Sequence, residues 1–127
     1  RAADVVRAFG DLAANAARAA AALEADDAKA LGAALDEYWR IKKLVAAGAN
    51  VEPRRVTKIL SVLRAAGAIH GASLCGAGGG GFLAVVAKTA DHAADHVRDV
   101  LRRGLGDNQG GASSVTTPGR PDDDDDA

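Results

Sequence analysis

Apolar side chains recur every three or four positions along four stretches of the chain, a spacing that places them on one face of an α-helix. The pattern predicts helices from residue 2 to about 24, from Asp26-Asp27 to about 46, from Glu52-Pro53 to Gly67, and from Thr89 to about 103. The expected inward faces of the last three are Leu31, Leu35, Tyr38, Ile41 and Val45; Val56, Ile59, Leu60 and Leu63; and Ala93, Val97, Val100 and Leu101.

The ends of the predicted helices carry residues that favour the start or the end of a helix. Asp26-Asp27 offers an aspartate that can accept hydrogen bonds from the first free amides as an N-cap, and Pro53 suits a first turn because its missing amide proton is not needed there. Gly48 and Gly67 are suited to end the second and third helices. The first helix is rich in alanine, the strongest helix former, and is interpreted as scaffold.

Two short stretches without this spacing flank a glycine-rich segment. Residues 71–75 are small, and residues 82–87 form a continuous apolar run that fits a central strand buried on both faces. Between them, five of the six residues from Gly76 to Gly81 are glycine. Glycine loses the most freedom on folding, so this run is expected where the backbone takes positive φ angles or approaches another group closely.

This glycine loop does not fit the common nucleotide-binding motifs. Gly76, Gly78 and Gly81 have the spacing G-x-G-x-x-G, but the dinucleotide motif requires a helix after the loop, whereas an apolar strand follows here. A Walker A loop continues from its last glycine into Lys and Ser or Thr, whereas Gly81 is followed by Phe82. The loop is therefore expected to join strand to strand.

The order of elements predicts an α+β fold. A hairpin with a helix before and after it is most of a ferredoxin-like split β-α-β-β-α-β unit, here with additional helices. Its first strand is not evident and is expected before Arg1, in a longer parent chain. Residues 1–105 are interpreted as one partial domain and residues 106–127 as a flexible acidic tail, in which 113–117 is a possible edge strand.

Composition narrows the function class. The chain has 127 residues and a net charge of −1, and five of its last ten residues are aspartate, so the remainder is only mildly basic. That balance argues against a nucleic-acid-binding protein. No apolar run reaches the length of a transmembrane helix, and no signal peptide is evident. The single cysteine, Cys75, permits no internal disulfide, so a cytoplasmic location is expected.

One pair of side chains has metal-ligand spacing. His92 and His96 stand four positions apart in the fourth predicted helix, flanked by Asp91, Asp95 and Asp99. No third ligand is evident, and such matches are frequent by chance. We therefore interpret this stretch as a solvated charged stripe and predict no metal site there.

The glycine loop and the strands beside it resemble a known family. Gly71-Ala72-Ser73-Leu74-Cys75-Gly76-Ala77-Gly78-Gly79-Gly80-Gly81-Phe82 resembles the third conserved motif of the GHMP small-molecule kinases, which include galactokinase, homoserine kinase and mevalonate kinase. Upstream, Glu37-Tyr38-Trp39-Arg40-Ile41-Lys42-Lys43-Leu44 is similar to a helix of the L-fucose kinases and heptose-7-phosphate kinases, and His70-Gly71 is closer to the fucose kinases. The resemblance covers roughly residues 27–103.

The resemblance implies the C-terminal domain of an ATP- and Mg²⁺-dependent sugar kinase. The phosphate loop of that family, of the type Pro-x-x-x-Gly-Leu-Gly-Ser-Ser-Ala, does not occur in these 127 residues, and neither does a recognisable catalytic base. Both are expected in an N-terminal kinase domain, which would bind most of the ATP and Mg²⁺, so this chain alone is expected to be inactive. The residues expected to contact the phosphate loop or the substrate are Gly76, Ala77, Gly78, Gly79, Gly80 and Gly81, with Trp39, Lys43 and Ser73 on the substrate side.

Other functions stay open. Heptose-7-phosphate kinase is the alternative within the family. A non-catalytic α+β interaction module is a different class, in which the loop is only a tight hairpin; the glycine count argues against it, because a two-residue turn needs one or two glycines. A third possibility keeps the fold and changes the chemistry, since relatives of these kinases include a decarboxylase and non-enzymatic paralogues.

Overall fold

The computed structural model describes residues 2–46, 51–75 and 81–106, and these form an α+β arrangement. The elements in chain order are α1 (Ala2–Glu24), α2 (Ala28–Val45), α3 (Arg54–Ala65), β1 (Ile69–Cys75), β2 (Phe82–Ala87) and α4 (Ala93–Leu105). The described part thus contains the α-β-β-α portion of the predicted split unit, preceded by two helices. The possible strand at 113–117 and the acidic tail lie outside the described residues.

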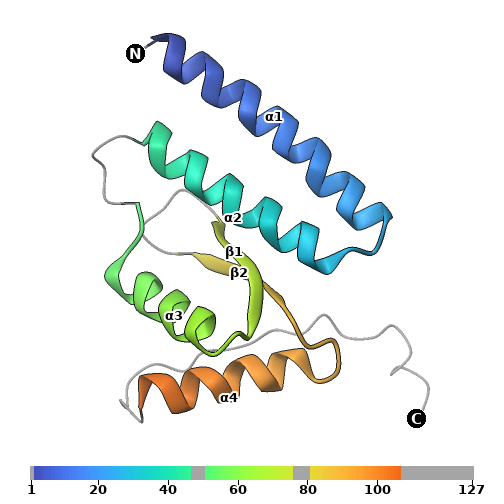
Figure 1. The fold of residues 1–127 in the computed structure, drawn as a ribbon. Helices are drawn as coiled ribbons and strands as arrows, with labels where there is room; N and C mark the ends of the chain where they lie inside the picture. Colours follow the sequence, from blue (N-terminus) through green and yellow to red (C-terminus); the bar gives the residue numbers. More distant parts are fainter. Residues whose placement is uncertain (1, 47–50, 76–80, 107–127) are drawn as a thin grey trace, which may run out of the picture.

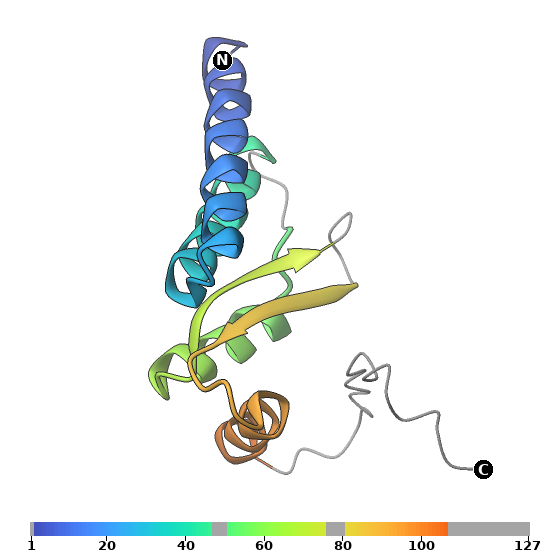
Figure 2. The ribbon, with the colours of Figure 1, turned by 90° about the vertical axis from the view of Figure 1, so that its right-hand side faces the viewer.

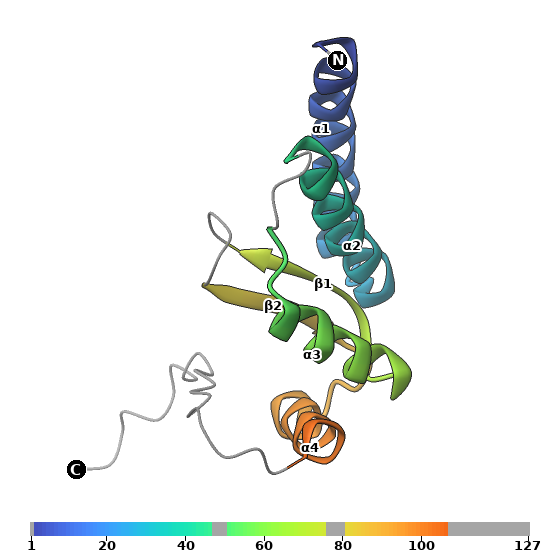
Figure 3. The same cartoon turned by 90° about the vertical axis from the view of Figure 1, so that its left-hand side faces the viewer.

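The β1–β2 hairpin lies between two pairs of helices (Figure 1). Helices α1 and α2 run antiparallel to each other on one side of it, and α3 and α4 lie together on the other side, as Figures 2 and 3 show from two directions. Helix α2 is the one that rests on β1. The glycine loop therefore connects two strands that are held from both sides.

The α1–α2 pair is joined by small side chains and one buried amide. Asn15 is buried in α1, and its Nδ2 donates a hydrogen bond of 2.8 Å to the carbonyl oxygen of Ala34 in α2. Ala22 and Ala34 are also buried. An aspartate caps α2 as predicted, and of Asp26 and Asp27 it is Asp27, whose Oδ1 accepts a hydrogen bond of 3.0 Å from the amide of Ala30.

Helix α2 approaches β1 closely because both carry glycine at the crossing. A Cβ at Gly71 would overlap the carbonyl group of Gly32, and a Cβ at Gly32 would overlap the backbone between His70 and Gly71. Both glycines are buried. Absence of side chains at this pair sets the spacing between α2 and the strand that leads to the glycine loop.

The main core lies on the opposite face of the hairpin. Its buried residues are Leu60, Leu63, Ala68, Ile69 and Ala72, packed against the partly buried Val56, Ile59, Leu83, Val85, Val97, Val100 and Leu101. These include all four predicted inner residues of α3 and, of those predicted for α4, Val97, Val100 and Leu101 but not Ala93. Burial of this aliphatic surface holds α3 and α4 against the sheet.

The prediction that residues 82–87 form a central strand buried on both faces is wrong for the described structure. Strand β2 pairs antiparallel with β1 alone among the described residues, with Ala72 opposite Val85 and Cys75 opposite Phe82. Phe82, its first residue, is 83% exposed, and the other residues of the strand are half-buried. An apolar run shows that side chains prefer burial, but it does not show whether a second strand is available to pair with it.

Two further predictions are wrong in detail. Helix α4 begins at Ala93 after His92, and not after Thr89, because the hairpin continues to Lys88, whose amide donates to the carbonyl of Ala68 at 2.9 Å. The helix also continues through Gly104 to Leu105. In α2, the buried residues are Gly32, Ala34, Trp39 and Ile41, whereas the predicted inner residues Tyr38 and Val45 are exposed.

The remaining helix predictions are confirmed within one or two residues. Helix α2 has Lys42 and Lys43 in its last turn and ends at Val45, while Gly48 lies outside the described residues. Gly67, with φ of +63°, follows α3 as predicted. Within the described residues no helix has the length and apolarity needed to cross a bilayer.

Candidate functional site

The two ends of the glycine loop are held in register by the sheet. Cys75 and Phe82 form the last pair of the ladder before the loop. Gly81 has φ of +110°, and a Cβ there would lie 2.8 Å from the carbonyl oxygen of Cys75. This position therefore requires glycine both for its backbone angle and for space, as the sequence predicts.

The other loop residues, from Gly76 to Gly80 with Ala77 among them, lie outside the described residues. Their predicted contact with a phosphate loop or substrate stays a prediction. Phe82 and Cys75, which flank the loop, are both exposed.

Strand β1 brings Ser73 to the α2 side of the hairpin. Successive residues of a strand point to opposite faces, and Gly71, two positions earlier, contacts Gly32 of α2. Ser73 is 1% exposed, and its Oγ donates a hydrogen bond of 3.3 Å to the carbonyl oxygen of Leu74. In this chain the hydroxyl is thus enclosed and locally bonded, and a role toward substrate stays a prediction.

Trp39 and Lys43 meet at one carboxylate that the sequence analysis did not single out. The indole Nε1 of Trp39 donates a hydrogen bond of 2.6 Å to Oε1 of Glu52, and Nζ of Lys43 lies 3.5 Å from the same oxygen. Lys43 also lies over the Trp39 ring, 5.9 Å from its centroid. The hydroxyl of Thr57 donates to Oε2 of Glu52 at 2.7 Å.

Trp39 is 5% exposed, so its ring belongs to the packed interior, with the indole N–H satisfied at the surface. Burial by itself would raise the pKa of Glu52. The hydrogen bonds from Trp39 and Thr57 and the charge of Lys43 outweigh that effect, and together they lower the pKa of Glu52 below its ordinary value. Glu52 is therefore an ionised acceptor that organises the α2–α3 junction.

A pocket of about 230 Å³ opens at this junction. It is lined by Asp36, Trp39, Arg40, Lys43, Glu52, Thr57, Leu60, Ser61 and Arg64. Asp36 accepts two hydrogen bonds from Arg64, of 2.8 and 3.1 Å, and one of 2.9 Å from the backbone amide of Ala72. This carboxylate, mainly through its hydrogen bonds, raises the pKa of Arg64 further above its already high value.

Asp36, Glu52, Thr57 and Arg64 are residues of the site that sequence reasoning missed. One signal for Asp36 was present: Asp36, Trp39 and Lys43 recur at helical spacings of three and four, so they share one stripe of α2. The partners of that stripe come from α3 and its N-terminal approach. No local pattern connects residues so far apart in the chain.

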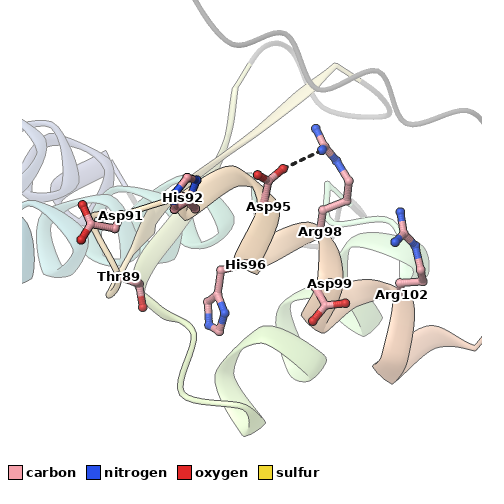
Figure 4. A pocket seen from close by; sticks show the side chains of 8 residues that line it. All are labelled: Thr89, Asp91, His92, Asp95, His96, Arg98, Asp99 and Arg102. Atoms are coloured by element: carbon pink, nitrogen blue, oxygen red, sulfur yellow. Dashed lines mark hydrogen bonds and ion pairs between the residues drawn. The ribbon is translucent and has the colours of Figure 1, made fainter.

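A second pocket, of about 540 Å³, lies along α4 and is lined by Thr89, Asp91, His92, Asp95, His96, Arg98, Asp99 and Arg102. Figure 4 shows Asp95 paired with Arg98, while His96 points away from that pair. In the described ranges no group of three or more His, Cys, Asp or Glu is arranged to hold a metal ion. Within this pocket Asp95 is paired with Arg98, and Asp99 is paired with Arg103 just outside it.

Comparison with known families identifies the chain at the level of its superfamily. Residues 19–105, more than half of the chain, match the family model described as GHMP kinases C terminal. No curated protein and no solved structure matches the chain. The matched region runs from the end of α1 to the end of α4 and includes both the glycine loop and the Trp39–Glu52 junction. The chain therefore belongs to the GHMP kinase family, of which it carries the C-terminal domain.

Proposed function

We propose that this chain is the C-terminal part of an ATP-dependent sugar kinase of the fucokinase type, which transfers the γ-phosphate of ATP to a sugar hydroxyl. Family membership supports a kinase. The sugar, and L-fucose in particular, rests on the resemblance of residues 37–44 and of His70-Gly71 to the fucose kinases. Heptose-7-phosphate kinase is the second candidate, because residues 37–44 resemble that branch as well.

The observation that carries the proposal is the held glycine loop. Its two ends are paired as Cys75 and Phe82, and Gly81 adopts a backbone angle that L-residues rarely take. Phosphoryl transfer is mainly positioning and charge stabilisation. A loop without side chains, fixed at both ends, allows a second backbone to approach and can direct its amides at an anion.

The proposal assigns most of the ATP and Mg²⁺ contacts to an N-terminal kinase domain. Mg²⁺ is usually held by carboxylates together with substrate phosphates. Among the described residues no group of three or more His, Cys, Asp or Glu is arranged to hold a metal ion, and the partly buried carboxylates of Asp36 and Glu52 already accept hydrogen bonds from protein donors. In this proposal, the chain supplies a packed surface against which the N-terminal, nucleotide-binding domain lies.

The test is a phosphorylation assay with the complete protein that contains this chain. ATP-dependent ADP release and ³¹P detection of the product are measured with L-fucose, D-galactose and a heptose 7-phosphate, and with homoserine and mevalonate as substrates of other family branches. We expect the highest kcat/KM with L-fucose. A preference for the heptose 7-phosphate moves the protein to the second candidate.

Absence of turnover with every substrate would remove the kinase proposal. A folded protein that binds a protein partner but neither ATP nor sugar would support the alternative of a non-catalytic interaction module. The sequence upstream of Arg1 gives an independent check, because a Gly-Leu-Gly-Ser-Ser type loop there supports phosphotransfer.

A further inference from the structure

Asp36 connects three elements of the domain. It lies on α2, its carboxylate accepts two hydrogen bonds from the guanidinium of Arg64 at the end of α3, and Oδ1 also accepts one of 2.9 Å from the amide of Ala72 in β1. Its side chain is 34% exposed, so the carboxylate sits at the mouth of the α2–α3 pocket. Charged acceptors and fork-shaped donors make stronger bonds than neutral pairs do.

The bond to Ala72 occupies the edge of β1 that faces away from β2. Ala72 stands opposite Val85 in the ladder, yet its N–H is donated to α2 and so points away from the partner strand. An unpaired amide at a strand edge would otherwise need water or another strand. Here the carboxylate of Asp36 on α2 accepts the hydrogen bond from the amide of Ala72 and so fixes β1 against the helix.

A displacement of β1 at Ala72 would reach the glycine loop. Ala72, Ser73 and Leu74 are all almost completely buried, and Cys75, the next residue, forms the last ladder pair before Gly76. Close-packed segments transmit a shift because they have no free volume in which to absorb it. At the other end, the Gly32–Gly71 contact sets the distance of β1 from α2.

We propose that Asp36 is a positioning residue for the end of β1 that leads into the glycine run. By holding Ala72 with Oδ1, and being itself oriented by Arg64, it sets the position of β1 along α2 and hence the position of Cys75, after which the glycine run begins. The inference rests on the proposed kinase function for its catalytic consequence. Its structural part, the tether of β1, does not depend on the identity of the substrate.

The experiment compares four substitutions in the complete protein. Asp36→Ala removes the tether, Asp36→Asn keeps a carbonyl acceptor for the Ala72 amide, and Asp36→Glu keeps the charge but displaces it by one methylene. Glu37→Gln is the matched control, because Glu37 is the neighbouring acid on α2 and pairs only with Arg40 among the interactions seen here. Kinase kinetics, thermal stability and amide exchange at Ala72 are measured on each.

We expect Asp36→Ala and Asp36→Glu to lower kcat by about 10- to 100-fold, because misplacement of a reacting group by about 1 Å costs up to about 100-fold. The KM for the sugar should change by less than about threefold, and Asp36→Asn should keep most of the activity, since it restores the acceptor. Amide exchange at Ala72 should accelerate at least about tenfold in Asp36→Ala. Glu37→Gln should match the wild type in every measurement.

The outcomes test the proposed kinase function and the positioning role of Asp36 separately. A wild-type protein without sugar phosphorylation refutes the proposed function, while the exchange rates still decide whether Asp36 holds β1. An active wild type with an equally active, folded Asp36→Glu variant refutes the positioning role. If Asp36→Ala does not fold, the other two variants at this position decide. A lower kcat in Asp36→Glu together with a retained kcat in Asp36→Asn supports the proposal. Equal kcat values in these two variants refute it.

Discussion

Among single residues, Gly81 and Glu52 have the largest influence on the conformation of the backbone and side chains around the site. Gly81 combines φ of +110° with a carbonyl oxygen only 2.8 Å from where a Cβ would stand. Glu52 gathers Trp39, Lys43 and Thr57 on its two oxygens. Gly81 thus sets the backbone conformation at the end of the glycine loop, and Glu52 holds the α2–α3 junction at the pocket.

Replacing Gly81 by alanine should destabilise the domain. The substitution forces an L-residue into a sparsely populated backbone region, which costs about 1–3 kcal/mol, and brings its Cβ against the Cys75 carbonyl. Gly10→Ala is the control, since Gly10 is helical and no atom lies within 4 Å of its Cβ position, so that variant should be neutral or slightly more stable. Denaturant unfolding of both variants measures the difference, and equal stability would contradict the assigned geometry.

Glu52 should make stability depend on pH in the acidic range. Because its pKa in the folded protein is lowered from 4.5, its contribution is fully present above that pH and is lost as the pH falls through the folded pKa. Glu52→Gln should therefore lower the free energy of unfolding at neutral pH and have a smaller effect near pH 3. Thr57→Val, which removes one of the hydrogen bonds, should give part of this change. A pH-independent difference between wild type and Glu52→Gln would contradict the argument.

At the scale of elements, the central relation is the crossing of α2 over β1. It needs glycine at both contact positions, and it is reinforced by the bond from the Ala72 amide to Asp36. Helix propensity disfavours glycine inside a helix, and strand propensity disfavours glycine inside a strand. The close approach explains both exceptions, because each glycine is placed where the other element's backbone passes.

Gly71→Ala should destabilise the domain by about 1–3 kcal/mol or more through overpacking at the Gly32 carbonyl. Gly32→Ala should have a similar effect from the other side of the same contact. Once one substitution has separated the two backbones, the second meets less resistance, so the double variant should cost less than the sum. Additive effects in equilibrium unfolding would show that the two glycines act independently.

At the scale of the whole molecule, the described chain has one core between the sheet and α3–α4 and a second packed layer formed by α1 and α2. The family model covers most of this arrangement. The sheet shows two strands within the described ranges, and the long N-terminal helix leaves Val6 and Phe9 exposed. The proposed kinase function assigns the phosphate loop, which does not occur in these 127 residues, to a second domain.

The chain by itself should show no kinase activity. It contains no Pro-x-x-x-Gly-Leu-Gly-Ser-Ser-Ala loop, and the carboxylates of Asp36 and Glu52 already accept hydrogen bonds from protein donors. Purified residues 1–127 should release no ADP above a buffer control with ATP, Mg²⁺ and L-fucose, while the complete protein does. Circular dichroism on the same sample shows whether the fragment is folded, and turnover by the fragment would refute the division of labour between the domains.

Features that depend on neighbours along the chain could be predicted from the amino-acid sequence. Alanine content for α1 and helical spacing for α2 to α4 located the helices within a few residues, Asp26-Asp27 was identified as the start of α2, and the glycine run marked a loop between two strands. Local rules are sufficient here, because backbone hydrogen bonds in a helix and φ preferences at glycine involve residues close in sequence. The motif around that loop was also sufficient to indicate the family.

Which charges form the site, and which apolar residues are covered, depends on the tertiary packing of the elements. Asp36, Arg64 and Ala72 come together from three elements, and Glu52 reaches Trp39 from outside α2. The exposure of β2 and the late start of α4 likewise depend on which elements pack beside them. Such contacts join residues 13 to 36 positions apart, and a carboxylate on a helix has the same local signature whether it faces solvent or holds a strand in place.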